Sequence, residues 1–141
     1  MSRRIRVLAL VVGLAGFTTA GPVGALDGSA LAADDVIQVV TSDENGTARV
    51  TKIWIVAVEG EAYIRTGDTK WGRNVERDAN VGLRTANGER DLRVEFVSDE
   101  ALRARVAQAY RQKYGWADRL ISPFRGRNPN IMHLLARGGG T

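Results

Sequence analysis

The sequence contains no cysteine and only one histidine, His133. Without cysteine the chain cannot form a disulfide bond, so its stability must come from a packed core. The same shortage excludes a metal centre built from histidine and cysteine ligands. A Ser-His-Asp catalytic triad would have to use His133, which lies near the C-terminus in an apolar, strand-like run. The composition therefore offers no recognisable centre for acid–base catalysis.

A membrane-spanning stretch is also missing, although the N-terminus is apolar. The apolar run at residues 7–17 is too short to span a membrane as a mature helix. It follows three arginines within residues 3–6 and precedes small residues, which is the pattern of a secretory signal peptide. We expect residues 1–25 to be this signal, with cleavage after Ala25 or as late as Ala32, and the protein to be periplasmic or extracellular. A membrane-anchored N-terminus is the alternative, and both Sec and twin-arginine export stay open.

The excess of positive charge is small once this signal is set aside. Three of the 20 lysine and arginine residues, and none of the 16 acidic residues, precede Leu26. The rest of the chain therefore carries a net charge of about +1. A nucleic-acid-binding role loses its main support, because such proteins present a pronounced basic surface.

Apolar alternation and turn signals predict an α+β domain, mainly antiparallel β, over residues 36–137. Residues 26–35 are rich in small and acidic residues and are expected to be a linker, and residues 138–141 a flexible tail. One short helix is expected between strands, and one longer helix in the C-terminal half. The expected strands lie at 36–41, 51–58, 62–66, 81–86, 89–97 and 131–135.

The strand at 51–58 is the centre of the predicted fold. It is apolar at nearly every position and rich in β-branched residues, which predicts burial on both faces. Glu59-Gly60 supplies a tight turn into the return strand. The register that follows from a two-residue turn pairs Ile55 with Ile64 and, on the opposite face, Trp54 with Arg65.

A short basic helix is expected after this hairpin, capped by Thr69 or Asp68. Lys70, Arg73 and Asn74 are spaced i, i+3 and i+4, so they lie on one face of it. Free backbone N–H groups at a helix start, with lysine and arginine beside them, favour a phosphate group. The alternative is a solvated basic turn, which is common after a hairpin.

Asn87-Gly88 predicts a second hairpin with a two-residue turn. The register that this turn implies pairs Val81 with Val94, Leu83 with Leu92 and Arg84 with Asp91.

The longer helix is expected to begin at a Ser98 cap and to end at Gly115. Leu102, Val106 and Tyr110 recur every four residues, so they form a stripe that packs on the barrel.

The stretch KIWIVAVEGEAYIRTGDTKWGRNVERDANVGL, followed by a charged hairpin and AYRQKYG, resembles the flavin-binding split β-barrels of the pyridoxamine-phosphate-oxidase-like superfamily. It is most similar to a small family of unknown function within it, related to deazaflavin-dependent nitroreductases. The resemblance implies a six-stranded split β-barrel that forms a homodimer. It also implies one FMN or deazaflavin in a groove at each end of the subunit interface.

The resemblance implies which residues contact the cofactor. By position in the motif, Arg49, Thr51 and Trp54 would line the groove for the isoalloxazine ring and the ribityl chain. Arg65 and Thr66 would lie near the phosphate, which Thr69, Lys70 and Arg73 would contact.

The leading functional hypothesis is a flavin-dependent oxidoreductase of unknown substrate, or at least a flavin-binding protein. In such enzymes the cofactor supplies the hydride chemistry and the protein supplies binding and orientation, which fits the lack of an acid–base centre. One alternative is a non-catalytic ligand-binding or structural protein of the cell envelope on the same barrel. Another is a small secreted barrel whose basic residues only solvate its surface.

The N-terminal pattern makes a direct prediction. We expect the native protein to be found outside the cytosol and to start near Leu26 or Ala33, because a signal peptidase cuts after small residues. N-terminal sequencing of the purified native protein checks this. A cytosolic protein that starts at Met1 or Ser2 would contradict it.

Overall fold

The computed structural model describes residues 26–118 and 129–137. The expected signal peptide, at 1–25, and the expected tail, at 138–141, lie outside the described residues. Within the described part of the chain, no helix has the length and apolarity needed to cross a membrane.

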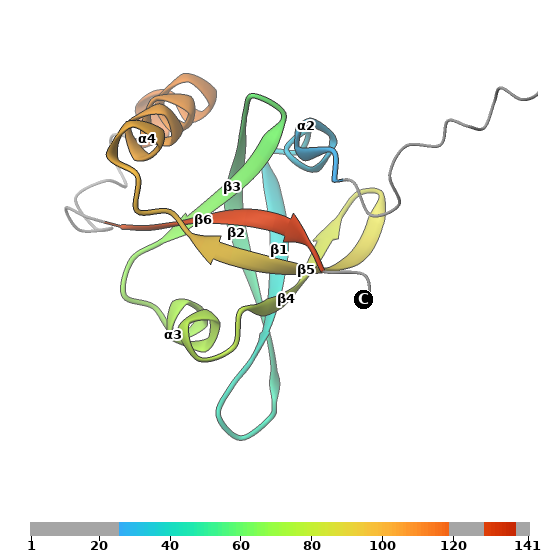
Figure 1. Cartoon of the computed structure of the whole chain (residues 1–141). Helices are drawn as coiled ribbons and strands as arrows, with labels where there is room; N and C mark the ends of the chain where they lie inside the picture. Colours follow the sequence, from blue (N-terminus) through green and yellow to red (C-terminus); the bar gives the residue numbers. More distant parts are fainter. Residues whose placement is uncertain (1–25, 119–128, 138–141) are drawn as a thin grey trace, which may run out of the picture.

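Six antiparallel strands form a closed barrel in the order β1-β2-β3-β6-β5-β4 (Figure 1). This confirms the α+β class, mainly antiparallel, that the sequence predicts. The elements in chain order are α2 Gly28–Leu31, β1 Val36–Ser42, β2 Ala48–Val58, β3 Glu61–Thr66, α3 Lys70–Arg77, β4 Asn80–Thr85, β5 Gly88–Phe96, α4 Glu100–Tyr114 and β6 Asn130–Ala136.

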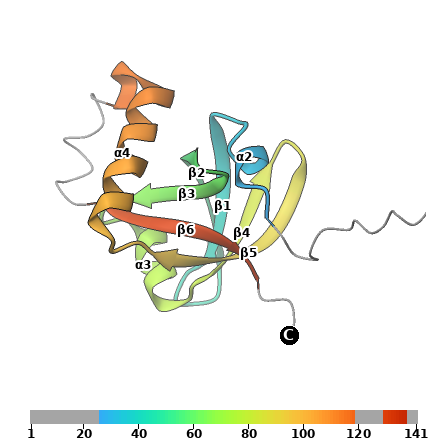
Figure 2. The ribbon, with the colours of Figure 1, turned by 45° about the horizontal axis from the view of Figure 1, so that its top comes forward.

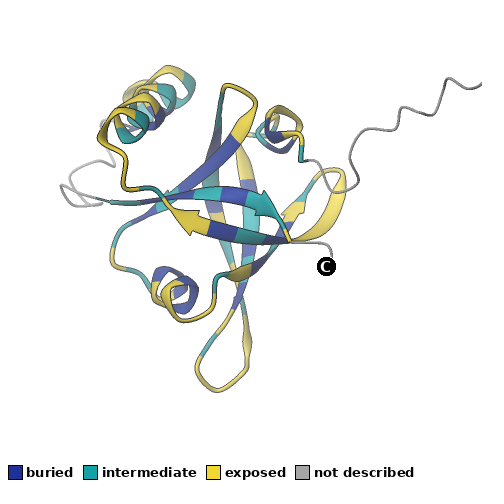
Figure 3. Cartoon of the chain, in the orientation of Figure 1, coloured by how far each residue is buried: buried dark blue, intermediate teal, exposed yellow. Residues whose placement is uncertain are grey.

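The hairpin formed by β2 and β3 has the predicted register. Ile55 pairs with Ile64, and both side chains are fully buried inside the barrel. Glu59 and Gly60 adopt φ values of 53° and 82°, so both central residues of the turn are left-handed, as the tightest hairpin turns require. The inner face of every strand contributes to this core, which Figure 3 shows as buried segments along the barrel.

Burial of β2 on both faces is confirmed only for its second half. Ile53, Ile55 and Val56 are buried, whereas Thr51 is half-buried and Lys52 is exposed. The reason is that α4 covers the outer face of β2 only around Trp54 and beyond, where the two elements pack together (Figure 2).

Helix α4 covers the barrel with the predicted stripe. Val106 and Tyr110 are fully buried against Val56 and Tyr63, and Leu102 packs at the edge of the same cluster. This second core lies outside the barrel, so β2 separates two apolar layers.

The C-terminal end of α4 is hydrogen-bonded to the backbone of β2. The Lys113 ammonium donates to the carbonyl oxygens of Ala32, Asp34 and Ile55, each at 2.8 Å. The Tyr114 hydroxyl accepts from the Ile55 N–H at 3.0 Å. Strand β1 pairs with β2 only as far as Trp54, so α4 supplies partners that the ladder no longer provides. Burial lowers the pKa of Lys113.

The predicted register of the second hairpin is wrong by two residues. Thr85 pairs with Gly88, so the turn residues are Ala86 and Asn87 and not Asn87-Gly88. The Thr85 hydroxyl accepts from the Asn87 N–H, and Gly88 takes the left-handed φ of 120° at the start of β5. A shift of two residues keeps every side chain on its expected face. The actual pairs are Val81 with Leu92, Leu83 with Arg90 and Arg84 with Glu89.

The cap of α4 also differs from the prediction. Asp99, and not Ser98, is the N-cap, and its carboxylate accepts from the Leu102 N–H at 2.8 Å. Serine and aspartate can both cap a helix. The helix begins at Glu100, so the residue before it, Asp99, is the cap. Gly115 ends the helix as predicted.

Residues 26–35 pack against the barrel and are more than a linker. Asp27 caps the short helix α2, and Leu31 is buried in the inner core. The Gly28 N–H donates to the Gly60 carbonyl at 2.9 Å, which brings α2 onto the turn between β2 and β3.

Gly28 lies too close to this turn to carry a side chain. An added Cβ would be 2.4–2.5 Å from the Gly60 oxygen and two further backbone atoms. Because these atoms cannot rotate away, we expect Gly28→Ala to lower the free energy of unfolding by about 1–3 kcal/mol. Urea denaturation measures this, with Ser29→Ala at the exposed neighbouring position as a control that changes it by less than about 0.5 kcal/mol. Equal stability of Gly28→Ala and wild type would contradict the docking of α2.

Candidate functional site

A pocket of about 380 Å³ lies where the loop between β1 and β2 meets α3. Its walls hold four basic and two acidic side chains, so an anion fits it better than a cation. The lining residues are Asp43, Glu44 and Asn45 from the loop, Arg49 from β2, and Lys70, Arg73, Asn74 and Arg77 from α3.

Local sequence positions both walls of the pocket. In the loop, the Asn45 side chain accepts from the Thr47 N–H, and Gly46 has a left-handed φ of 88°. On the other side, Thr69 caps α3 by accepting from the Gly72 N–H at 3.1 Å. The cap confirms one of the two predicted positions.

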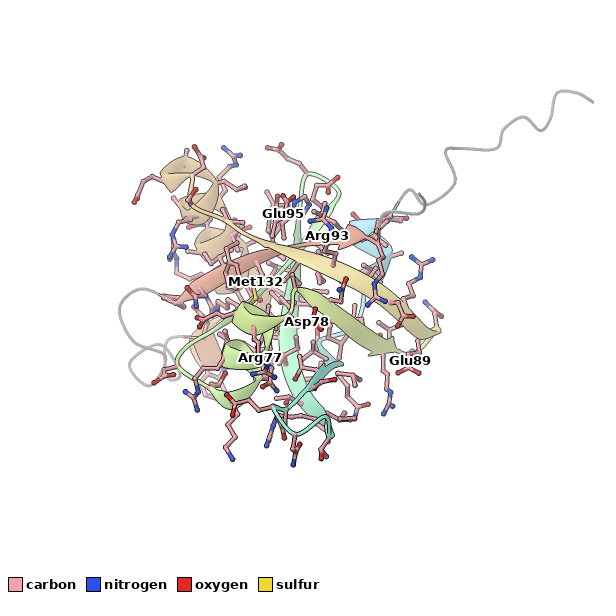
Figure 4. All side chains as sticks on the ribbon, turned by 60° about the horizontal axis from the view of Figure 1, so that its bottom comes forward. Arg77, Asp78, Glu89, Arg93, Glu95 and Met132 are labelled. Atoms are coloured by element: carbon pink, nitrogen blue, oxygen red, sulfur yellow. The ribbon has the colours of Figure 1, made fainter. Side chains whose placement is uncertain are left out.

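The pocket lies along the side of α3 and not at its N-terminus. Lys70, Arg73, Asn74 and Arg77 occupy positions i, i+3, i+4 and i+7, which form one helical face. The predicted stripe of three residues is therefore confirmed and extends by one turn. Figure 4 shows Arg77 on the side of α3 that faces the strands β1 and β2.

A buried amide holds the two walls together. Asn74 is only 5% exposed, and its Nδ2 donates to Thr41 Oγ1 at 3.0 Å and to Asp43 Oδ1 at 2.8 Å. Its Oδ1 accepts from Arg77, which also donates to the Ser42 carbonyl. Because buried polar groups are costly when unpaired, this network fixes α3 against β1.

Asp43 is bound by two hydrogen bonds from one guanidinium. Arg49 Nε donates to Oδ1 at 2.8 Å, and Arg49 Nη2 donates to Oδ2 at 3.1 Å. These bonds, followed by the bond from Asn74, lower the pKa of Asp43 from 3.8 to about 2, and the charge of Lys70 adds to the effect. The carboxylate therefore stays ionised at neutral pH.

Two of the cations on α3, Lys70 and Arg73, are available to a ligand. Within the described part of the chain, Lys70 has no hydrogen-bond or ion-pair partner. Arg73 pairs with Asp68 across the surface, where both side chains are largely exposed. Exposed pairs of this kind exchange readily with another anion, because each contributes little.

Three of the eight residues that the resemblance implies as cofactor contacts line this pocket: Arg49, Lys70 and Arg73. Thr51 lies on the same face of β2 as Arg49. The hydroxyls of Thr66 and Thr69 are 2.7 Å apart at the start of α3.

The other two residues of that set lie on the far side of the sheet, under α4. Trp54 stacks on Tyr114 with ring centroids 4.1 Å apart. The Arg65 side chain is only 7% exposed, pairs with Asp118, and lies 3.6 Å over the Tyr110 ring. Arg49 and Trp54 are separated by five residues, so strand alternation places them on opposite faces. One copy of the chain therefore does not bring all eight residues into one groove.

Sequence reasoning missed Asp43, Glu44, Asn45 and Arg77 as pocket residues. The sequence did indicate Arg77 as a pocket residue, since it continues the spacing of Lys70 and Arg73 by one helical turn. Asp43 had none, because its contact with Asn74 joins residues 31 positions apart.

His133 is not part of this pocket. Its Nε2 lies 2.6 Å from Glu61 Oε1, and its ring stacks on Tyr63 with centroids 4.9 Å apart. Across residues 26–118 and 129–137, no group of three or more potential metal ligands gathers.

Residues 29–130 match the model of a family described as "Uncharacterized protein conserved in bacteria (DUF2255)". The chain belongs to this family. This match confirms the prediction, made from the motif, of a family of unknown function. Among curated proteins, none matches the sequence.

Solved structures with the same fold differ widely in sequence. The heme storage protein HutZ of Vibrio cholerae is 14% identical, with a TM-score of 0.61 over 77% of this chain and 86% of that one. An FAD-binding protein of Mesorhizobium loti is 12% identical, with a TM-score of 0.54 over 76% and 84%. An F420-H2 dependent reductase is 13% identical, with a TM-score of 0.57 over 70% and 93%. At these identities the likeness shows the fold alone, which is the split barrel.

The bonds to Asp43 predict how the pocket responds to pH. Its folded pKa is below the ordinary value, so its contribution to stability is present above pH 3.8 and is lost as the pH falls toward 2. We expect the Asp43 carboxyl carbon to titrate near pH 2 by NMR. In Arg49→Met the midpoint should rise toward 3.8, because the main cause of the shift is removed. An unchanged midpoint in that variant would contradict the assignment.

Proposed function

We propose that this barrel binds a flavin-type cofactor, FMN or a deazaflavin, and holds its phosphate in the basic pocket between α3 and the β1–β2 loop. The observation that carries the proposal is the set of four cations around one pocket. Lysine and arginine bind phosphate through charge-assisted hydrogen bonds, and arginine matches its oxygens in pairs.

The residues present fit such a group. The Lys70 ammonium makes no hydrogen bond or ion pair to any described residue, and the exposed Arg73–Asp68 pair can open toward an anion. Arg49 and Arg77 are held in place by Asp43 and Asn74, so they offer their remaining N–H groups from fixed positions. When bound, the cofactor supplies hydride transfer, and this chain binds and orients it.

The structural neighbours support the class of ligand. One is named as FAD-binding and one as dependent on F420-H2, and both share the barrel. The reaction that we propose is therefore an oxidation or reduction of a small substrate.

A non-catalytic ligand-binding protein is the second candidate. One observation favours it: Tyr114 covers a face of the Trp54 ring, which then cannot stack on an isoalloxazine ring from that side. Bleaching of the flavin absorbance by a nicotinamide or deazaflavin donor, followed by reoxidation, separates a redox enzyme from a binding protein.

We also propose that the protein is exported and acts as a homodimer. Val36 and Val50 are 48% and 44% exposed on the outer side of β1 and β2, where a second copy would cover them. A shared cofactor would also explain how Arg49 and Trp54, on opposite faces of β2, contact one ligand. Light scattering at micromolar concentration should give the mass of a dimer, and a monomer mass would count against it.

The phosphate pocket predicts how binding depends on two cations. Lys70→Ala/Arg73→Ala should weaken FMN binding about thirtyfold to a hundredfold or more, because each charge-assisted bond is worth roughly 1.5–3 kcal/mol and Arg73 must first leave Asp68. Riboflavin, which lacks the phosphate, should bind both proteins alike. Fluorescence titration with each flavin measures the effect.

A matched control removes two positive charges away from the pocket. Arg90→Ala/Arg111→Ala changes the net charge equally, and neither residue lines the pocket. We expect its affinity for FMN to stay within about twofold of wild type. Equal losses for FMN and riboflavin in the pocket variant would mean that Lys70 and Arg73 support the fold and not the phosphate.

A further inference from the structure

The pocket contains a carboxylate that a simple phosphate site does not need. Asp43 lies among four cations, and it is bound to the pocket walls on both sides by Arg49 and Asn74. A carboxylate beside a phosphate weakens phosphate binding, but it can also accept a hydrogen bond from a hydroxyl group of the same ligand.

We propose that Asp43 recognises a hydroxyl group next to the phosphate, so that the pocket selects a polyol phosphate monoester over inorganic phosphate and over diphosphates. This inference rests on the proposed function, and it names the part of the cofactor that the pocket contacts and distinguishes from other anions. The matching chemical class is a sugar or sugar-alcohol 5-phosphate, such as a ribityl phosphate.

The hydrogen bonds of Asp43 leave one acceptor position open. A carboxylate oxygen accepts about two hydrogen bonds. Oδ1 already accepts from Arg49 Nε and from Asn74 Nδ2, each at 2.8 Å. Among residues 26–118 and 129–137, Oδ2 accepts only from Arg49 Nη2, at 3.1 Å. The side chain is 26% exposed and lines the pocket, so a hydroxyl donor can reach the second position on Oδ2.

The position of this oxygen is fixed before any ligand binds. Arg49 orients the carboxylate through two parallel bonds, and Asn74 is buried and held in turn by Thr41 and Arg77. A group held in this way loses little freedom on binding, which favours discrimination between ligands that differ by one hydroxyl.

The net charge of the pocket limits how much negative charge a bound anion can carry. Four cations and two carboxylates leave a net charge of about +2, which matches a dianionic phosphate monoester. Asp43 stays ionised at neutral pH, so it repels the additional negative charge of a diphosphate. A deazaflavin with acidic groups beyond its phosphate should therefore bind less well than FMN.

The experiment compares two phosphate monoesters, with and without hydroxyl groups, and a diphosphate. Calorimetric titrations at low ionic strength compare ribitol 5-phosphate, n-pentyl phosphate and pyrophosphate. The first two have chains of equal length, and only the first carries hydroxyl groups. Wild type should bind ribitol 5-phosphate about tenfold more tightly than n-pentyl phosphate, the effect of one hydrogen bond to a charged group.

Two variants separate hydroxyl recognition from net charge. Asp43→Asn should lose most of the preference for ribitol 5-phosphate and bind pyrophosphate about threefold more tightly or better. Glu76→Gln removes a negative charge from α3 at a position that does not line the pocket, and it should keep the hydroxyl preference. Asp43→Glu keeps the charge but displaces the oxygen, so it serves if Asp43→Asn does not fold, and it should lose the hydroxyl preference alone.

Three results would overturn the inference in distinguishable ways. Equal affinity of wild type for ribitol 5-phosphate and n-pentyl phosphate would remove the role of Asp43 and leave the phosphate pocket in place. An absence of binding to FMN and to both monoesters would remove the proposed function and this inference together. A hydroxyl preference that survives in Asp43→Asn or Asp43→Glu would assign it to another residue.

Discussion

Strand β2 has to serve two apolar layers at once, and the rest of the structure depends on how it does so. Its side chains alternate between the barrel interior and the layer under α4. Ile53 and Ile55 belong to the first layer, and Trp54 and Val56 to the second. The same alternation continues beyond both cores toward the start of β2, where the Arg49 side chain lines the pocket.

The C-terminal end of α4 is hydrogen-bonded to the barrel from its outer side. Lys113 and Tyr114 bind backbone atoms of Ile55 and of the segment before β1. Tyr110 donates to the Trp54 carbonyl at 3.0 Å. The sequence AYRQKYG, which marks the resemblance to split barrels, is thus an anchor between helix and barrel. Its tyrosines and lysine hold the fold, and the pocket residues come from elsewhere in the chain.

Local rules predicted the parts of the fold that neighbours in sequence decide. Glu59-Gly60 set the register of β2 and β3, and the spacing of Lys70, Arg73 and Asn74 set the pocket face of α3. The same rules failed where two nearby residues offered similar chemistry. Ser98 and Asp99 can both cap α4. In the second hairpin the turn residues are Ala86 and Asn87, one residue before the predicted Asn-Gly pair, and the Thr85 hydroxyl accepts a hydrogen bond within this turn. The linker prediction failed because composition does not show that Leu31 finds a place in the core.

The candidate site could be predicted only in part, for a related reason. The cations on α3 share one helix, so their grouping follows from spacing. The contact between Asp43 and Asn74 depends on how the barrel closes, and no local pattern reports it. Strand alternation, in contrast, was present in the sequence, and it already separates Arg49 from Trp54 within one subunit.

The docking of α2 bears on how the N-terminus can be processed. Gly28 rests on the turn at Gly60, and Leu31 fills part of the inner core. Removal of the chain through Ala32 would take away both, together with the Ala32 carbonyl that Lys113 binds. Cleavage after Ala25 would keep these contacts, whereas cleavage after Ala32 would leave all six strands, which begin at Val36, but would remove the helix that packs on the turn between β2 and β3.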